Sequence, residues 1–200
     1  MIWTRGRVKT EVLQLLESTN DPEAVAKVDT WVDAGLDDFW AQCRPWWAQR
    51  VASATVDDGV IILPPSYLGM VAIFPLGGGT ALSPCTSEQA AEYFQLPGDP
   101  QYFLIEGYTM SLVPEPVDGV KYRFTYWSKG DPLTDDGSTN ALLENAPMAL
   151  VYAAARHGDT FAGSDPSQSR HEDAFQKQVA QLNRSSKSGR LGTGYTVMRG

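Results

Sequence analysis

The feature that most constrains the fold is the spacing of apolar residues, which changes twice along the chain. Up to about residue 50 these residues recur at the spacing of one helix face. Between 51 and 130 short β-prone runs alternate with turn residues, and from 131 the helical spacing returns. We therefore predict an α+β fold: a helical bundle, with two N-terminal and two to three C-terminal helices, that carries an inserted small antiparallel β-domain.

The predicted domain limits follow these changes. Residues 1–50 form N-terminal helices, 51–130 the inserted antiparallel β-region, 131–184 C-terminal helices that pack on the N-terminal ones, and 185–200 a flexible, extended tail. The tail is predicted because Gly, Ser and basic residues dominate positions 185–194 and cannot bury enough apolar surface to become ordered. It ends in the short β-prone segment Tyr195-Thr196-Val197-Met198.

The helix boundaries are marked by specific signals. Asp21 is predicted as an N-cap with Pro22 at the first helical position, and Asp165-Pro166 is predicted to open the last helix. The apolar stripes on the predicted helix faces are Val8, Val12, Leu15 and Leu16; then Val25, Val28, Val32, Leu36 and Phe39; and finally Phe175, Val179 and Leu182.

The β-region contains about six predicted short strands, arranged as a small sandwich or barrel. Asp58-Gly59 is predicted to join two strands as a hairpin turn. The runs 102–106, 109–113 and 120–127 are predicted to form a meander, with turns at Gly107 and Asp118-Gly119.

Charge is distributed unevenly along the chain. All 24 acidic side chains lie between residues 11 and 173, whereas both ends are basic, and the formal net charge is −8. An acidic body is not expected to bind nucleic acid over its main surface. The basic ends could engage an acidic partner, although composition alone favours an ordinary solvated surface with a loose tail.

No catalytic site, cofactor site or metal site is expected. His157 with Asp159 and His171 with its acidic neighbours would permit a metal site if their helices packed antiparallel, but H-E-x-x-H spacing is absent. The two cysteines are expected to be free. The chain start lacks the apolar run of a signal peptide, and no stretch approaches the length that spans a bilayer, so we expect synthesis in a cytoplasm and no membrane contact.

The order of these parts resembles the head-to-tail adaptor proteins of tailed bacteriophages, also called head-completion or connector proteins. The resemblance depends on a helix that runs into an aromatic cluster, a strand followed by Leu-Pro, two later strand pairs, and a proline-started helix. These segments are residues 31–47, 62–68, 98–116, 122–134 and 142–155.

The resemblance implies a virion protein without enzymatic activity. It implies a ring, a dodecamer, beneath the portal protein, which links the DNA-filled capsid to tail or neck proteins and lets the genome pass through its lumen without specific binding. Such a ring is assembled in the host cytoplasm and resides at the virion neck. The tail then becomes a portal-docking arm whose terminal segment adds a strand to the portal; its candidate residues are Arg184, Lys187, Arg190, Leu191, Tyr195, Val197 and Met198.

Other functions remain open at the level of sequence. The chain could be another neck, tail-completion or capsid-decorating protein of the virion. The β-region and the tryptophans would also suit a carbohydrate-binding or cell-wall-degrading module. A cytoplasmic enzyme is disfavoured because no nucleophile and base, and no metal-ligand set, stand out.

Overall fold

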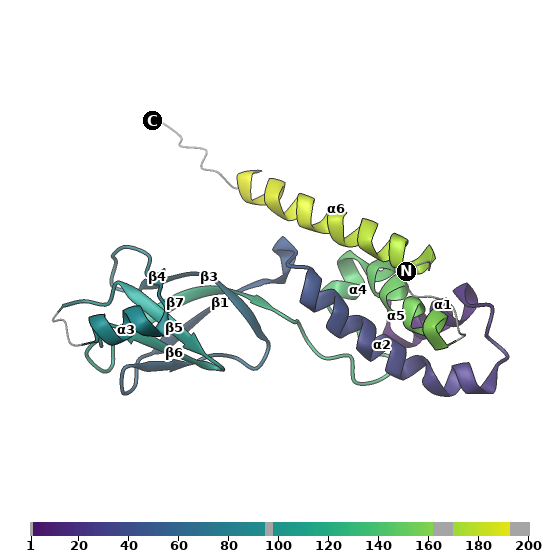
Figure 1. Cartoon of the computed structure of the whole chain (residues 1–200), viewed down its shortest axis with the longest axis horizontal. Coiled ribbons are helices and arrows are strands. Elements are labelled where there is room, and N and C mark those ends of the chain that lie inside the picture. The colour runs from purple at the N-terminus through teal and green to yellow at the C-terminus, as the bar shows by residue number, and fades with distance from the viewer. Residues whose placement is uncertain (1, 95–97, 162–169, 193–200) are drawn as a thin grey trace. The chain divides into compact units, whose positions relative to one another are not determined.

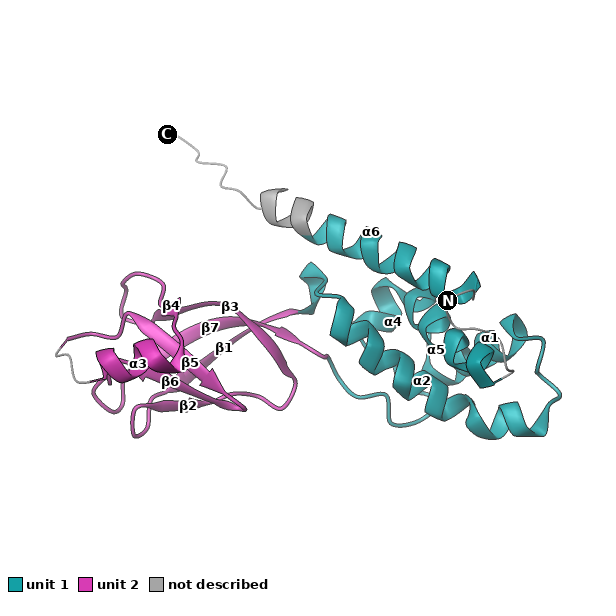
Figure 2. Cartoon of the chain, in the orientation of Figure 1, with its two compact units in different colours: residues 1–48, 130–200 teal, residues 49–129 magenta. Residues whose placement is uncertain are grey.

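The chain divides into two compact units, one of which is inserted within the sequence of the other. The computed structural model describes residues 2–94, 98–161 and 170–192, without the side chains of 187–192 (Figure 1). Unit 1 comprises Met1–Ala48 and Gly130–Gly200, and unit 2 is Gln49–Lys129 (Figure 2). Unit 1 is helical and unit 2 contains the strands, so the predicted α+β class is confirmed.

Unit 1 is built from two separate stretches of the chain. Its described helices are α1 (Arg5–Leu15), α2 (Pro22–Gln42), the 3-10 helix η1 (Trp46–Ala48), α4 (Ala141–Asn145), α5 (Pro147–Phe161) and α6 (Arg170–Gly192). The predicted start of α2 is confirmed: the Asp21 carboxylate accepts a hydrogen bond of 2.9 Å from the backbone N–H of Glu23, and Pro22 follows in the first turn.

The core of unit 1 follows most of the predicted stripes. Val8, Val12, Val28, Val32 and Phe39 are buried, and so is Phe175 on α6. The prediction was wrong for Val25, which is 46% exposed. The buried face of α2 runs through Ala24 and Val28 instead, and Val25 falls at the border of that face because successive helical residues are turned by about 100°.

Helices α2 and α5 approach closely because small residues meet at their contact. A Cβ added at Gly35 would lie 2.8 Å from the backbone N of Ala154 and 3.0 Å from the backbone C of Ala153. Both of these alanines are fully buried. The backbones therefore touch with no room for a side chain at position 35.

Unit 2 is a sandwich of two sheets. One sheet has the order β1-β7-β3, and the other the order β2-β6-β5-β4. The strands are β1 (Gln49–Thr55), β2 (Val60–Ile62), β3 (Tyr67–Pro75), β4 (Ser83–Pro84), β5 (Tyr102–Glu106), β6 (Thr109–Val113) and β7 (Lys121–Ser128), with helix α3 (Ser87–Tyr93) between β4 and β5. Side chains from both sheets, such as Ile61, Ile73, Met110 and Phe124, form one buried cluster.

Two predicted strand pairings are wrong. The predicted turn at Asp58-Gly59 is present and is closed by a bridge between Asp57 and Val60, but the flanking strands β1 and β2 belong to different sheets. The hairpin of β5 and β6 at Gly107 is confirmed, but β7 pairs with β1 and β3 rather than with β6. Strand β6 is already bonded on both sides, by β2 and β5, so it has no free edge for β7.

Two further differences concern strand direction and the last helix. The pair β4–β5 is parallel, although only two residue pairs long. Helix α6 continues to Gly192, past the predicted end of the helical region at 184, while Asp165-Pro166 lies outside the described residues.

We predict that Gly35→Ala destabilises the protein by about 1–3 kcal/mol. Alanine has the higher helix propensity, but the backbone of α5 cannot move aside as a flexible side chain can. Urea unfolding followed by far-ultraviolet circular dichroism measures the change. Gly77→Ala is the matched control, because an added Cβ there meets nothing within 4 Å. A Gly35→Ala variant as stable as the native chain would contradict this account of the helix contact.

Candidate docking site

The candidate docking residues lie on helix α6 or come after it in the sequence. This helix is the last described part of unit 1. Its inner face packs against α5. Phe175 is fully buried, Val179 is nearly so, and Leu182 is half-buried, in agreement with the predicted stripe. The helix is the yellow element in Figure 1.

Two polar side chains join α6 to the C-terminal end of α2. Asn183 Nδ2 donates to the Gln42 carbonyl at 3.2 Å, and Asn183 Oδ1 accepts from the Arg44 backbone N–H at 3.4 Å. The buried Ser186 hydroxyl accepts from the Trp46 backbone N–H at 3.0 Å. These bonds satisfy backbone groups at a helix end, which otherwise lack partners.

The same serines explain why the helix passes position 185. The hydroxyls of Ser185 and Ser186 each donate to the Leu182 carbonyl at 2.8 Å. A serine that bonds to the preceding turn is accommodated inside a helix. No proline interrupts the stretch. The Ser-rich composition therefore does not end the helix, and residues 185–186 belong to the bundle.

The structure describes the seven predicted docking residues to different extents. Arg184 is exposed on α6 and lines a shallow hollow on its outer side together with Lys177 and Gln181. Lys187, Arg190 and Leu191 lie on the helical backbone of α6, where side chains are not described. Tyr195, Val197 and Met198 lie outside the described residues. The seven are therefore not brought together as one described site.

Sequence reasoning missed Asn183 and Ser186 as functional positions. Both are ordinary polar residues on a polar stretch, and only the tertiary fold brings them to α2. They hold in place the helix that leads to the candidate docking segment.

A second polar cluster joins α2, α5 and α6 through Arg156. Its guanidinium bonds to the Asp38 carboxylate and to Glu172 Oε2, the latter at 2.6 Å, and it lies 4.8 Å from the centre of the Phe175 ring. His157 Nε2 also contacts Asp38, at 2.6 Å. Burial raises the pKa of Asp38, but the hydrogen bonds from Arg156 and His157 outweigh it and leave that pKa below its usual value.

The two histidines are used separately. His157 faces Asp38, whereas the buried His171 contacts Asp159 Oδ2 through Nδ1 at 2.7 Å. No group of three potential metal ligands occurs in the parts of the chain that the structure describes. Cys43 and Cys85 are unpaired. Burial raises the pKa of the Cys43 thiol to about 11, which keeps it protonated and poorly nucleophilic at neutral pH.

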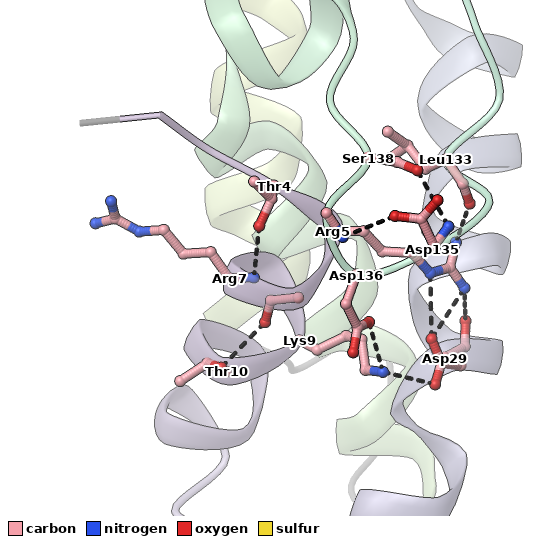
Figure 3. A network of polar contacts seen from close by, with 12 residues as sticks. Thr4, Arg5, Arg7, Lys9, Thr10, Asp29, Leu133, Asp135, Asp136 and Ser138 are labelled. Carbon is pink, nitrogen blue, oxygen red and sulfur yellow. Dashed lines mark hydrogen bonds and ion pairs between the residues drawn. The ribbon is translucent and has the colours of Figure 1, made fainter.

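A third cluster, around Arg5, holds the segment that returns from unit 2 (Figure 3). The Arg5 guanidinium bonds to Asp33 at 2.6 Å, to Asp29 at 3.1 Å and to the Leu133 carbonyl at 2.9 Å. Its backbone N–H donates to the Ser138 carbonyl at 3.0 Å. One buried arginine thereby ties α1 to α2 and to the residues between β7 and α4.

The N-terminal basic residues are consequently not a free docking end, contrary to expectation. Lys9 bridges Asp29 at 2.9 Å and Asp136 at 3.0 Å, and Arg7 lies 3.6 Å from Glu11. Their charges are neutralised within unit 1. Of the two basic ends, this leaves the C-terminal region as the candidate for an acidic partner.

We predict that Asp29→Asn removes part of the pH dependence of stability. The hydrogen bond from Lys9, with that from Arg5, lowers the pKa of Asp29 below 3.8, although partial burial opposes the shift. Stability from a carboxylate with a lowered pKa is fully present above the unfolded-state pKa and is lost as the pH falls through the folded-state pKa. The variant should therefore be less stable at neutral pH by about 1 kcal/mol or less, since surface ion pairs contribute little, and the difference should shrink below about pH 4.

Urea unfolding across a pH series measures this difference. Glu92→Gln, at an exposed carboxylate of α3, is the matched control for exchanging a carboxylate for an amide. Parallel stability curves for the native chain and Asp29→Asn would show that Asp29 does not contribute in this way.

The described chain is a two-unit α+β protein in which the three polar clusters join helices, and none of its described helices is long and apolar enough to span a membrane. The profile of the SU10 adaptor protein family matches residues 4–196. The match covers both units, and the chain belongs to this family of bacteriophage adaptor proteins. It is thus a structural protein of the virion neck, where adaptors interact with head and tail proteins. No curated protein matches the sequence.

Proposed function

We propose that the chain is one subunit of a dodecameric ring that docks beneath the portal protein, links the DNA-filled capsid to the tail, and has no enzymatic activity. The ring is assembled in the host cytoplasm. The observation that carries the proposal is the match to the adaptor family over residues 4–196. The three polar clusters agree with a structural role for the chain, since each of them holds helices together.

Docking is assigned to the C-terminal region. Asn183 and Ser186 fix α6 to α2, and the helical backbone then continues to Gly192. Lys187 and Arg190 therefore follow directly from a fixed point in unit 1. The β-prone segment 195–198 comes next in sequence and is suited to strand addition at a sheet edge of the portal.

The charge of the chain agrees with a role around the DNA exit channel. The net charge is −8, and the N-terminal cations are paired with carboxylates. A lumen lined by Lys and Arg would retain DNA through counterion release. An acidic subunit surface instead lets the genome pass without being held.

We predict that deleting residues 193–200 abolishes loading onto the portal but leaves the fold intact. The truncation keeps Ser186 and its bond to Trp46, which a cut after residue 184 would remove. The thermal unfolding midpoint should be unchanged, and co-sedimentation with purified portal rings should be lost. A truncated chain that loads at native affinity would contradict the docking role of this segment.

A salt series separates the two expected contributions to docking. Replacing Arg184, Lys187 and Arg190 together by Ala should weaken portal binding by about 1–3 kcal/mol, because each exposed ion pair contributes up to about 1 kcal/mol. The loss should diminish as salt rises, since exposed charges are screened. Val197→Asp should weaken binding with little dependence on salt, because it disturbs strand addition.

The matched control for the triple variant is Lys27→Ala, which removes an exposed cation from α2. Binding curves from light scattering or co-sedimentation with purified portal report all variants. If neither the triple variant nor Val197→Asp changes portal affinity, docking lies elsewhere and the chain is a different component of the neck.

A further inference from the structure

The edges of the two sheets in unit 2 differ in how open they are to another strand. Proteins commonly protect sheet edges with short strands, bulges, prolines or lysines. Strands β2 and β4 are only three and two residues long, and β3 contains two register shifts. Strand β1 is longer and regular: its seven residues, of which only Arg50 is charged, pair with β7 in unbroken register, and among the described strands β7 is its sole sheet neighbour.

From Val51 to Thr55 the side chains of β1 alternate between the two faces of its sheet. Ala52 and Ala54 pair with Phe124 and Tyr122 and pack against the buried cluster. The alternate residues point to the outer face, where Val51 is 55% exposed and Ser53 and Thr55 are also exposed. A strand added beside β1 would continue both faces, with apolar residues on the inner side.

The outer face beside β1 carries positive charge and no acid. Arg123 lies opposite Ser53, and Lys121 lies opposite Thr55. Both cations are exposed, and neither forms a salt bridge with a described residue. The register also places Gln49, Val51, Thr125, Trp127, Ala72 and Phe74 on this side of the sheet. In a chain with an excess of acidic residues, this face has the opposite charge to the whole.

We propose that the outer edge of β1 binds, by strand addition, an extended acidic segment of another protein of the neck. The edge supplies backbone hydrogen bonds, and alternate side chains supply selectivity. An added strand would lie about 10 Å from β7, two strand spacings away, a gap that an extended Arg or Lys and an extended Glu bridge together. The segment would place apolar residues beside Ala52 and Ala54, and Asp or Glu on the face of Arg123.

This chemistry favours a peptide over nucleic acid. Two cations on a flat face neutralise few phosphates, and DNA offers no strand backbone to pair with β1. The proposal rests on the proposed function in one respect: the partner is another protein of the assembled neck. It concerns a surface in unit 2, whereas portal docking is assigned to the C-terminal region of unit 1.

The experiment places the photo-cross-linking residue benzoylphenylalanine at Ser53 in the full-length chain, within assembled particles. Ile62, which is 71% exposed on the short edge strand β2, is the matched control position. After irradiation, mass spectrometry identifies the adducts. We expect position 53, and not 62, to cross-link to an acidic segment of a different virion protein.

Charge reversal tests the electrostatic part of the proposal. Arg123→Glu or Lys121→Glu should lower the yield of the adduct by roughly tenfold, since like charges across an interface oppose binding. Lys27→Glu makes the same change of charge on the exposed side of α2 and should leave the yield unchanged. An adduct with DNA, an adduct with a second copy of this chain, a yield insensitive to reversal, or no adduct at 53 would each overturn the proposal.

Hydrogen exchange on the native chain provides a second readout that needs no substitution. Amides of residues 50–55 should exchange more slowly in the particle than in the free chain. Equal exchange overturns the inference about β1. Absence of the native chain from the neck of the particle would instead contradict the proposed function, so the two failures are distinguishable.

Discussion

The bundle depends on the close contact of α2 with α5, because this contact joins the two halves of unit 1 across the inserted β-unit. Gly35 meets the backbone of Ala153 and Ala154, so the two helices approach without intervening side chains. Asp38, one turn further along α2, then reaches Arg156 and His157 on α5, and Arg156 continues to Glu172 on α6. Because the helices pack closely, the polar groups of all three helices lie within bonding distance of one another and form one network.

The chain passes from unit 1 to unit 2 and back through two connections, and the unit 1 side of each carries hydrogen bonds. The first and last strands of unit 2 are neighbours, with Gln49 paired to Trp127, so the chain enters and leaves the sandwich at one place. On the return side Arg5 binds the Leu133 carbonyl, and on the entry side Asn183 and Ser186 bind the residues that follow α2.

The sequence predicts local features well and long-range pairings poorly. The start of α2 follows from Asp21 and Pro22, because capping is decided within a few residues. The sheet assignment of β7 does not, because it depends on β6 already being bonded on both sides by strands distant in sequence. The roles of Arg5 and Ser186 are likewise invisible in sequence, since a basic or polar residue near a chain end is typical of a solvated surface and gains its partners only from the fold. The resemblance to phage adaptors can be recognised in the sequence because it depends on the order of helices and strands along the chain.

The central claim, that this chain forms part of the neck between head and tail, is tested most directly by locating it in the virion. Residues 107–108 form an exposed turn between β5 and β6 in unit 2, and this turn is suited to the insertion of a short affinity tag. Electron microscopy of particles labelled through that tag with gold-conjugated antibody gives the position. The account predicts label at a single vertex, between the capsid and the tail. Label spread over the capsid faces or confined to the distal end of the tail would contradict it.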